Sequence, residues 1–227
     1  MGRPLRVDVG GEIFHVLNLA NAKQKIFQHN GDFKAFEAIL EEGLKTFAVR
    51  LYAYQIMPNH WHMVLSPDKD GELSRFVGWL TLTHTQRYHV YKGTVGYGHL
   101  YQGRYKSFLI EKDSYFIRVC RYVERNALRS GLVRRAEDWR WGSAWIRNNG
   151  SPNQKRMLSP WPEEIPKNYS AELNDDDEGD DNKSELDSIR YAVNKSSPFG
   201  NIDWKSKVTQ LFGLKATTRP SGRPRKK

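Results

Sequence analysis

The stretch from residue 47 to residue 65 constrains the fold of this chain more than any other. Side chains over residues 47–56 alternate along the chain, Pro58 and Asn59 follow, and a second apolar run extends from His60 to Leu65. A period of two is typical of a β-strand, and a Pro-Asn pair between two such runs is typical of a turn. The sequence therefore predicts a β-hairpin, and with it an antiparallel sheet.

The remaining periodic segments complete a pattern around this hairpin. Strands are predicted over residues 12–17 and 105–110, and helices over residues 32–44, 72–90 and 113–132. The order strand, helix, strand, strand, helix, strand is typical of a ferredoxin-like arrangement. We therefore predict an α+β fold whose antiparallel sheet has its helices packed on one face, followed by an irregular C-terminal extension.

Two histidines separated by one residue stand on the second strand of the hairpin. Because successive side chains of a strand point to opposite faces, His60 and His62 share one face and Trp61 lies on the other. Neutral imidazole binds Mn, Zn, Fe, Co and Ni, and two such ligands leave positions for a third protein group, water and a phosphate. The pair predicts a metal site, although a His-x-His pair on a strand also occurs without a metal.

The helix predicted over residues 113–132 carries a polar edge beside its apolar face. At about 100° per residue, Tyr115, Tyr122 and Asn126 fall along one edge, whereas Glu124 lies about 200° round from Tyr122. Tyr122 and Asn126 are one turn apart, so a metal ion bound by Asn126 would stand next to the Tyr122 hydroxyl. An amphipathic helix with tyrosines at the border of the core would show the same pattern.

Together these segments resemble a known enzyme family. His60-Trp61-His62 matches the His-hydrophobe-His signature of HUH endonucleases, and residues 121–126 resemble the tyrosine helix of the single-tyrosine transposases of that superfamily. A closer resemblance is to the REP-associated tyrosine transposases, bacterial enzymes similar to insertion-sequence transposases and tied to repetitive extragenic palindromes. Further segments carrying it are Arg3-Pro4-Leu5-Arg6, Phe14-His15-Val16, Met57-Pro58-Asn59, residues 98–107, Trp141-Gly142-Ser143-Ala144, Pro198-Phe199-Gly200 with Trp204, and Gly222-Arg223-Pro224-Arg225-Lys226.

The resemblance implies roles for particular residues. It implies that Tyr122 is the catalytic nucleophile and that His60, His62 and Asn126 bind a divalent metal, Mg²⁺ or Mn²⁺. The chain departs from the family at two places. It has Leu19-Ala20-Asn21 where members often have Arg-Gly-Asn, so the loop lacks that arginine, and it has Asn126-Ala127 where members often have Asn-Pro, which keeps the polar ligand.

The charge of the chain predicts a nucleic-acid partner. Its 227 residues include 36 Lys and Arg against 26 Asp and Glu, a net charge of +10, and the pI is about 9.6. With a mean hydropathy of −0.73 and no long apolar run or signal-peptide pattern, we expect a soluble, cytoplasmic protein that does not bind membranes. The single cysteine, Cys120, excludes an intrachain disulfide and a Cys-cluster zinc site.

Changes in composition divide the chain into three predicted parts. Residues 1–160 are long enough for one core and would form the HUH transposase-like catalytic domain. Residues 161–188 contain an acidic stretch without aromatics and would be a disordered linker. Residues 189–227 would form a docking element and a basic DNA-binding tail.

Candidate DNA contacts lie in two of these parts. The loop before the last strand interleaves the cations Arg104 and Lys106 with Tyr101 and Tyr105, a combination that suits unpaired nucleic acid because bases stack on rings while cations meet phosphates. An ordinary exposed loop would have a similar composition. In the tail, Arg223 and Arg225 lie in a basic segment without acidic residues, which predicts affinity for phosphates.

The sequence thus favours a metal-dependent single-strand DNA endonuclease and strand transferase. It would act on hairpin, palindromic-repeat DNA through a 5′-phosphotyrosine on Tyr122. The alternative is a non-catalytic regulatory protein that binds hairpin DNA with the same basic surface. A zinc hydrolase is a third reading, but the third ligand and the general base expected of such sites are missing from the pattern.

Overall fold

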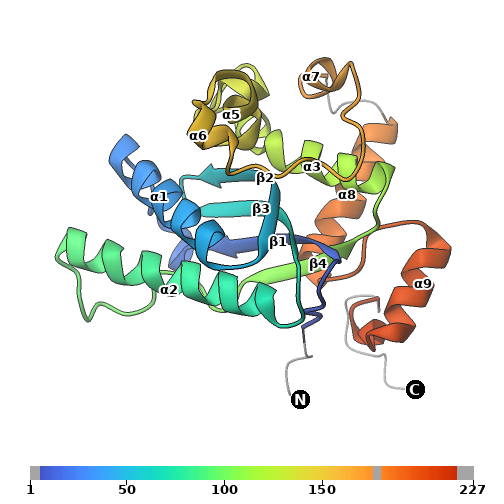
Figure 1. Cartoon of the computed structure of the whole chain (residues 1–227), viewed down its shortest axis with the longest axis horizontal. Helices are drawn as coiled ribbons and strands as arrows, with labels where there is room; N and C mark the ends of the chain where they lie inside the picture. The colour runs from blue at the N-terminus through green and yellow to red at the C-terminus, as the bar shows by residue number, and fades with distance from the viewer. Residues whose placement is uncertain (1–5, 176–179, 219–227) are drawn as a thin grey trace, which may run out of the picture.

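A four-stranded antiparallel sheet forms the centre of the computed structural model, which describes residues 6–175 and 180–218 (Figure 1). The strands are β1 (Ile13–Leu19), β2 (Val49–Met57), β3 (His60–Pro67) and β4 (Lys106–Ile110), in the order β2-β3-β1-β4. With α1 (Asn30–Thr46) and α2 (Glu72–Lys92), they confirm the predicted α+β class and the ferredoxin-like order of elements. The other helices are α3 (Ser114–Glu124), α4 (Asn126–Arg129), α5 (Ser143–Asn149), α6 (Pro152–Lys155), α7 (Tyr169–Glu172), α8 (Asp180–Lys195), α9 (Ile202–Leu211) and the short 3₁₀ turns η1 (Asn21–Lys23), η2 (Ala136–Asp138) and η3 (Leu214–Ala216).

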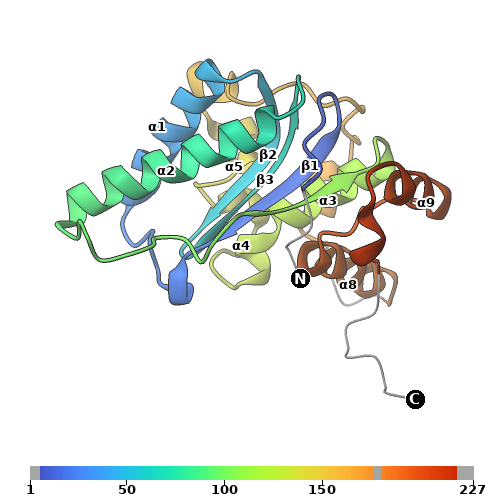
Figure 2. The same cartoon turned by 90° about the horizontal axis from the view of Figure 1, so that it is seen from below.

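Helices cover both faces of the sheet, which differs from the expectation that they would cover one. In Figure 2, α1 and α2 lie on one side of the sheet and α3, α4 and α8 on the other. The first side buries Trp61 against Phe36, with ring centres 5.9 Å apart, and the second buries Cys120 and Val64 in a separate cluster. The reason is that nearly every position of β1, β2 and β3 is buried, and a sheet that is apolar on both faces needs two covering layers.

The helix that carries Tyr122 is broken, whereas the sequence predicted one continuous helix over residues 113–132. It begins as expected, since the Asp113 side chain accepts from Tyr115 N at 2.8 Å. It ends at Glu124 because the amide of Gln55 enters the helical ladder: its nitrogen donates to Val123 O and Glu124 O, at 3.1 and 2.9 Å, and its oxygen accepts from Ala127 N at 2.9 Å. The helix resumes as α4, with the break facing β2.

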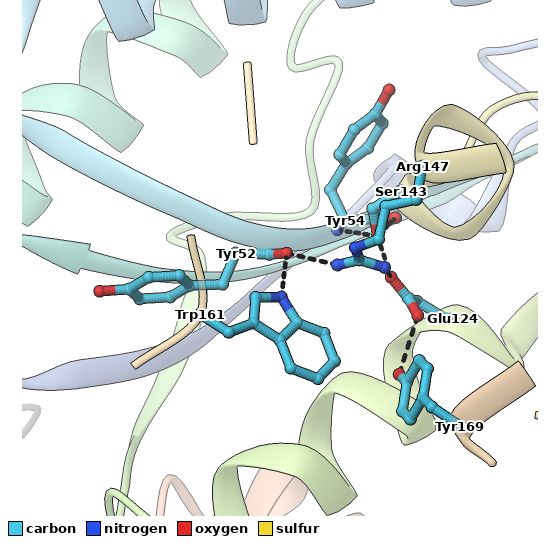
Figure 3. A network of polar contacts seen from close by, with 7 residues as sticks. All are labelled: Tyr52, Tyr54, Glu124, Ser143, Arg147, Trp161 and Tyr169. Carbon is cyan, nitrogen blue, oxygen red and sulfur yellow. Dashed lines mark hydrogen bonds and ion pairs between the residues drawn. The ribbon is translucent and has the colours of Figure 1, made fainter. Parts of the chain in front are cut away.

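A buried carboxylate fastens the opposite side of this helix to the rest of the fold (Figure 3). Glu124 is fully buried and accepts hydrogen bonds from Ser143 and Arg147 of α5 and from the Tyr169 hydroxyl of α7, the last at 2.8 Å. Arg147 also donates to Tyr52 O at 2.7 Å, which connects the network to β2. The side chain that points away from the Tyr122 edge therefore sets the position of α3 on the sheet.

Residues 161–188, which were expected to form a disordered linker, contain the whole of α7 and the first part of α8. α7 packs under Glu124, and α8 begins at Asp180 and lies against α3 and β4. α8 buries Ile189 and Ala192, and its Glu185 contacts Arg118 at 3.4 Å. Apolar side chains late in the helix thus give it a packing face that the acidic composition hides. No described helix is long and apolar enough to cross a bilayer.

Candidate active site

The hairpin of β2 and β3 places the two predicted histidines on the α3 side of the sheet, as the alternation predicted. Trp61 points the other way, is fully buried, and donates from its indole nitrogen to the Tyr101 hydroxyl at 3.1 Å. The rings of His60 and His62 have centres 5.0 Å apart at an angle of 79°. The Tyr122 ring stands edge-on to His62, with 5.9 Å between the ring centres. Tertiary packing thus brings together a histidine pair and a tyrosine that are some sixty residues apart.

Each histidine of the pair is held through its Nδ1 atom. His60 Nδ1 lies 2.6 Å from Asn59 Oδ1, and His62 Nδ1 lies 2.8 Å from Nε2 of a third histidine, His15 on β1. Burial lowers the pKa of His60 to about 4 and that of His15 to about 3. Burial, with the neighbouring rings and Arg129, holds the pKa of His62 well below its usual value. The rings are therefore neutral at pH 7, which is the form that binds metals.

The residues present fit a divalent cation held by two imidazoles and an amide. Metal–nitrogen bonds to histidine are about 2.1 Å long, so two rings that share an ion must lie close together, and the 5.0 Å between the ring centres of His60 and His62 meets this requirement. The amide nitrogen of Asn126 donates to Tyr122 O and Val123 O, both at 3.1 Å, so its oxygen is the end left for a ligand role. Over residues 6–175 and 180–218, no three His, Cys, Asp or Glu side chains form a group that could hold a metal. An amide or solvent ligand would complete the set.

Tyr122 sits among cations at the border of the core. The guanidinium of Arg129 lies 4.6 Å from the centre of the Tyr122 ring and also donates to the Tyr122 backbone carbonyl. Burial raises the pKa of the Tyr122 hydroxyl, and Arg129 and Arg190 partly offset this by favouring the phenolate. Tyr115, on the same predicted edge, instead packs on Phe199 with 5.3 Å between ring centres.

The four candidate DNA contacts of the loop divide into two kinds. Arg104 and Lys106 are exposed. Tyr101 and Tyr105 are 7 % exposed, and their hydroxyls contact His84 at 2.7 Å and Ser74 at 3.0 Å. Arg6 lies 3.8 Å above the Tyr105 ring. In this structure the cations are available to a ligand while the tyrosine rings are part of the packing. Arg223 and Arg225 of the tail lie outside the described residues.

An open groove runs along the edge strand β4 beside the loop. Two adjoining cavities of about 530 and 620 Å³ share Arg6, Asn18 and Arg104 in their walls, and Lys106 and Lys195 line the first. Leu17 of β1 pairs with both His62 of β3 and Lys106 of β4, so one row of the sheet leads from the groove to the histidine pair. Two strand spacings amount to ~10 Å.

Sequence reasoning missed three residues of this site. In the sequence, His15 stands out only as part of a family-like segment, and no pattern assigns a role to Gln55 or Arg129. His15 does lie on a predicted strand at an odd-numbered position, like Leu17, but the strand register that places it beside His62 is not readable from the sequence. Gln55 pairs with His62 across the hairpin, and this partner was within reach of a register count from the turn.

Comparison with one solved structure, the first described here, supports the same fold. The structure of a REP-associated tyrosine transposase bound to a REP hairpin matches with a TM-score of 0.54 and 16 % identity, covering 68 % of this chain and 90 % of that one. A protein from Deinococcus radiodurans R1 described as a transposase matches with a TM-score of 0.37 and 14 % identity over 58 % of this chain and 91 % of its own. Among curated protein sequences, no significant match was found.

Comparison with protein families gives the assignment. The family model described as "Transposase IS200 like" matches residues 9–126. That range contains the whole sheet, both helices of its first face, and α3 with Tyr122. It ends at Asn126, so His15, His60, His62, Tyr122 and Asn126 lie within the matched region, whereas Arg129 lies just beyond it. Because the match spans just over half of the chain and includes His60, His62 and Tyr122, the protein belongs to the IS200-like transposase family.

Proposed function

We propose that this transposase is a metal-dependent single-strand DNA endonuclease and strand transferase that uses Tyr122 as its nucleophile. The observation that carries the proposal is the Tyr122 ring edge-on to His62, 5.9 Å away, on the face that His62 shares with His60. A binding protein has no need to set a hydroxyl beside a pair of neutral imidazoles. Membership of a transposase family supports an enzyme that acts on DNA.

His60, His62 and the Asn126 amide oxygen would hold a divalent cation, Mg²⁺ or Mn²⁺. When bound, this cation would supply Lewis-acid polarisation of the scissile phosphate. The Tyr122 oxygen would attack phosphorus, the bond from phosphorus to the 3′-oxygen would break, and solvent would accept the phenolic proton and protonate the leaving oxygen. The products are a 5′-phosphotyrosine and a free 3′-hydroxyl, which can attack in the reverse direction and join strands without ATP.

Hairpin DNA is the substrate class that we propose. The groove beside β4 has the cations Arg104, Lys106 and Lys195 in its walls and leads along one sheet row to the histidine pair. Such a surface suits a backbone that passes from a short stem into unpaired nucleotides. A protein with the same fold was solved bound to a REP hairpin, which supports a partner of this class.

The test compares two tyrosines of one helix. The protein is incubated with a labelled single-stranded hairpin oligonucleotide and Mn²⁺, and adducts that survive denaturation are counted on a gel. We expect Tyr122→Phe to abolish both cleavage and adduct while leaving hairpin affinity within severalfold, because affinity comes from cations spread over the surface. Tyr115→Phe is the matched control, since Tyr115 packs on Phe199, and it should keep both.

Metal variants and adduct mapping complete this test. His60→Ala and His62→Ala should each abolish cleavage and keep hairpin binding, and Asn126→Ala should lower cleavage less, since an amide oxygen is a weaker ligand than imidazole. A nucleotide mapped to Tyr115 by mass spectrometry would overturn the assignment of the nucleophile. Tight hairpin binding with no adduct under any cation would leave the non-catalytic regulatory protein as the function.

A further inference from the structure

A third histidine stands behind the proposed metal ligands and has no part in the proposed function so far. His15 lies on β1 with its Nε2 2.8 Å from His62 Nδ1, and the two side chains are 1 % and 3 % exposed. The register that pairs His62 with Leu17 places His15 diagonally across from His62 on the same face of the sheet. Its ring packs on Phe108, with centres 4.8 Å apart, so it has a fixed place.

A contact between two imidazole nitrogens at this distance needs one hydrogen between them. If His62 Nδ1 carries the proton, His62 donates and its Nε2 keeps a lone pair that can bind a cation. If His15 Nε2 carries it, His62 is the acceptor, its proton lies on Nε2, and a metal bond from that atom is excluded. The tautomer of this one hydrogen bond therefore decides whether His62 can act as a ligand.

The other proposed ligand has the same arrangement with a different partner. His60 Nδ1 lies 2.6 Å from the side-chain oxygen of Asn59, and a carboxamide oxygen only accepts hydrogen bonds. His60 therefore donates from Nδ1, which leaves its Nε2 unprotonated. The ring centres of His60 and His62 are 5.0 Å apart. Each ring thus contacts a neighbouring side chain through its Nδ1 atom, Asn59 for His60 and His15 for His62.

We propose that His15 is a positioning residue that accepts the Nδ1 proton of His62 and so fixes the tautomer and orientation in which His62 binds the cation. The inference rests on the proposed function, because it assumes His62 as a ligand. Partners of this kind hold the ring of a metal-bound histidine and raise its basicity, and their loss costs about 10–100-fold in metal affinity. The Tyr122 ring also lies edge-on to His15, with 6.1 Å between the ring centres. His15 therefore packs beside Tyr122 as well as beside His62.

Imidazole NMR of the full chain tests the tautomer without any metal. Two-bond ¹H–¹⁵N correlation spectra, assigned with the His15→Gln and His62→Ala variants, report which nitrogen of each ring is protonated. We expect His62 with its proton on Nδ1 and His15 with an unprotonated Nε2. A proton on His62 Nε2 would overturn the proposal.

Mn²⁺ titration followed by electron paramagnetic resonance tests the role. His15→Phe keeps an aromatic ring at this position but removes the nitrogen that accepts from His62. We expect the affinity for Mn²⁺ to fall about 10–100-fold. His15→Gln places an accepting oxygen near the same point and should restore most of it. His84→Phe is the matched control: His84 is also 3 % exposed and hydrogen bonded, to Tyr101 on the opposite face, and its loss should leave Mn²⁺ affinity unchanged.

The remaining outcomes separate this inference from the function it rests on. Unchanged affinity in His15→Phe, with affinity lost in His62→Ala, would overturn the positioning role and leave the metal site intact. Affinity lost as fully in His15→Gln as in His62→Ala would make His15 a direct ligand, which also overturns it. Unchanged affinity in both His60→Ala and His62→Ala would instead overturn the proposed metal site itself.

Discussion

Neighbouring residues of β3 point to opposite faces of the sheet. The strand therefore contacts the candidate active site on one face and the loop that contains Tyr101 on the other. His60 and His62 face α3, while Trp61 between them reaches the Tyr101 hydroxyl, which in turn contacts His84 of α2 at 2.7 Å. Tyr101 lies in the loop that was predicted to contact DNA. These hydrogen bonds therefore fix the position of the loop relative to the histidine strand. We expect Tyr101 to affect DNA binding by positioning the loop.

Asp32 is a residue whose environment predicts a pH dependence of stability. Burial would raise the pKa of Asp32, but hydrogen bonds from Gln28 N and His29 N and the ion pair with Lys92, at 2.9 Å, outweigh it and hold the pKa below the usual 3.8. A depressed carboxyl pKa stabilises the fold above about pH 4, and this contribution is lost as the pH falls through the lower folded-state value.

We therefore expect Asp32→Asn to lower the free energy of unfolding at pH 7 by ~1 kcal/mol, because the first turn of α1 loses charge-assisted hydrogen bonds. Urea denaturation of both proteins from pH 7 to pH 2 checks this. The gap between them should narrow below pH 4. A difference in the free energy of unfolding that stays constant from pH 7 to pH 2 would show that ionisation of Asp32 does not contribute to stability.

At the scale of elements, the important fact is how α3 is held. Its Tyr122 edge faces the histidines, Gln55 of β2 enters the helix at its C-terminal end, and Glu124 fastens the far side to α5 and α7. The contacts of the histidines and of Gln55 come from the sheet on which α3 packs, and the contact of Glu124 comes from α3 itself. The proposed nucleophile, Tyr122, therefore stands on a helix that is held at several points, and such positioning would favour in-line attack.

Removing the Glu124 carboxylate should destabilise the fold strongly. Glu124→Ala would leave the Ser143 and Tyr169 hydroxyls without their buried acceptor and Arg147 without its counterion, and one-sided loss of a buried pair costs about 3–5 kcal/mol. Urea denaturation measures the loss. Glu185→Ala is the matched control, because its pair with Arg118 is partly exposed and should be worth less than ~1 kcal/mol. Equal effects of the two substitutions would contradict the anchoring role.

For the whole molecule, the distribution of charge predicts where the proposed DNA substrate would bind. The chain has a net charge of +10, and several cations line the groove beside the edge strand β4. In the proposed function, phosphate contacts contribute affinity and orientation, whereas the chemistry depends on the histidine face of the sheet. Binding and cleavage should therefore be separable by mutation.

Arg104→Ala and Lys106→Ala should each weaken hairpin binding and lower the steepness of its salt dependence by roughly one unit per lost phosphate contact. Cleavage per bound complex should stay the same. Fluorescence anisotropy from about 50 to 200 mM salt measures the slope. Lys34→Ala, an exposed cation of α1, carries the same charge change and should leave the slope nearly unaltered. A slope unchanged by all three would place the DNA elsewhere on the surface.

Features of this protein that depend on local rules can be predicted from its amino-acid sequence. Alternation along residues 47–65 predicted the hairpin, and the same alternation put His60 and His62 on one face and Trp61 on the other. Helical periodicity placed Glu124 away from Tyr122, and the order of elements indicated the α+β fold. These features follow from backbone geometry within a few residues, so one segment at a time was enough to find them.

Contacts between distant segments are seen only in the three-dimensional fold. Strand register sets His15 beside His62, and a register is a relation between two strands that neither strand encodes alone. The packing of α3 and α4 on β2 brings Gln55 into the tyrosine helix, and this too is a relation between distant segments. The covering of both faces, the burial of Tyr101 and Tyr105, and the helix in the acidic segment likewise depend on partners elsewhere in the chain. Burial is a property of packed surfaces, and a polar or aromatic side chain shows its role only when its neighbours are in place.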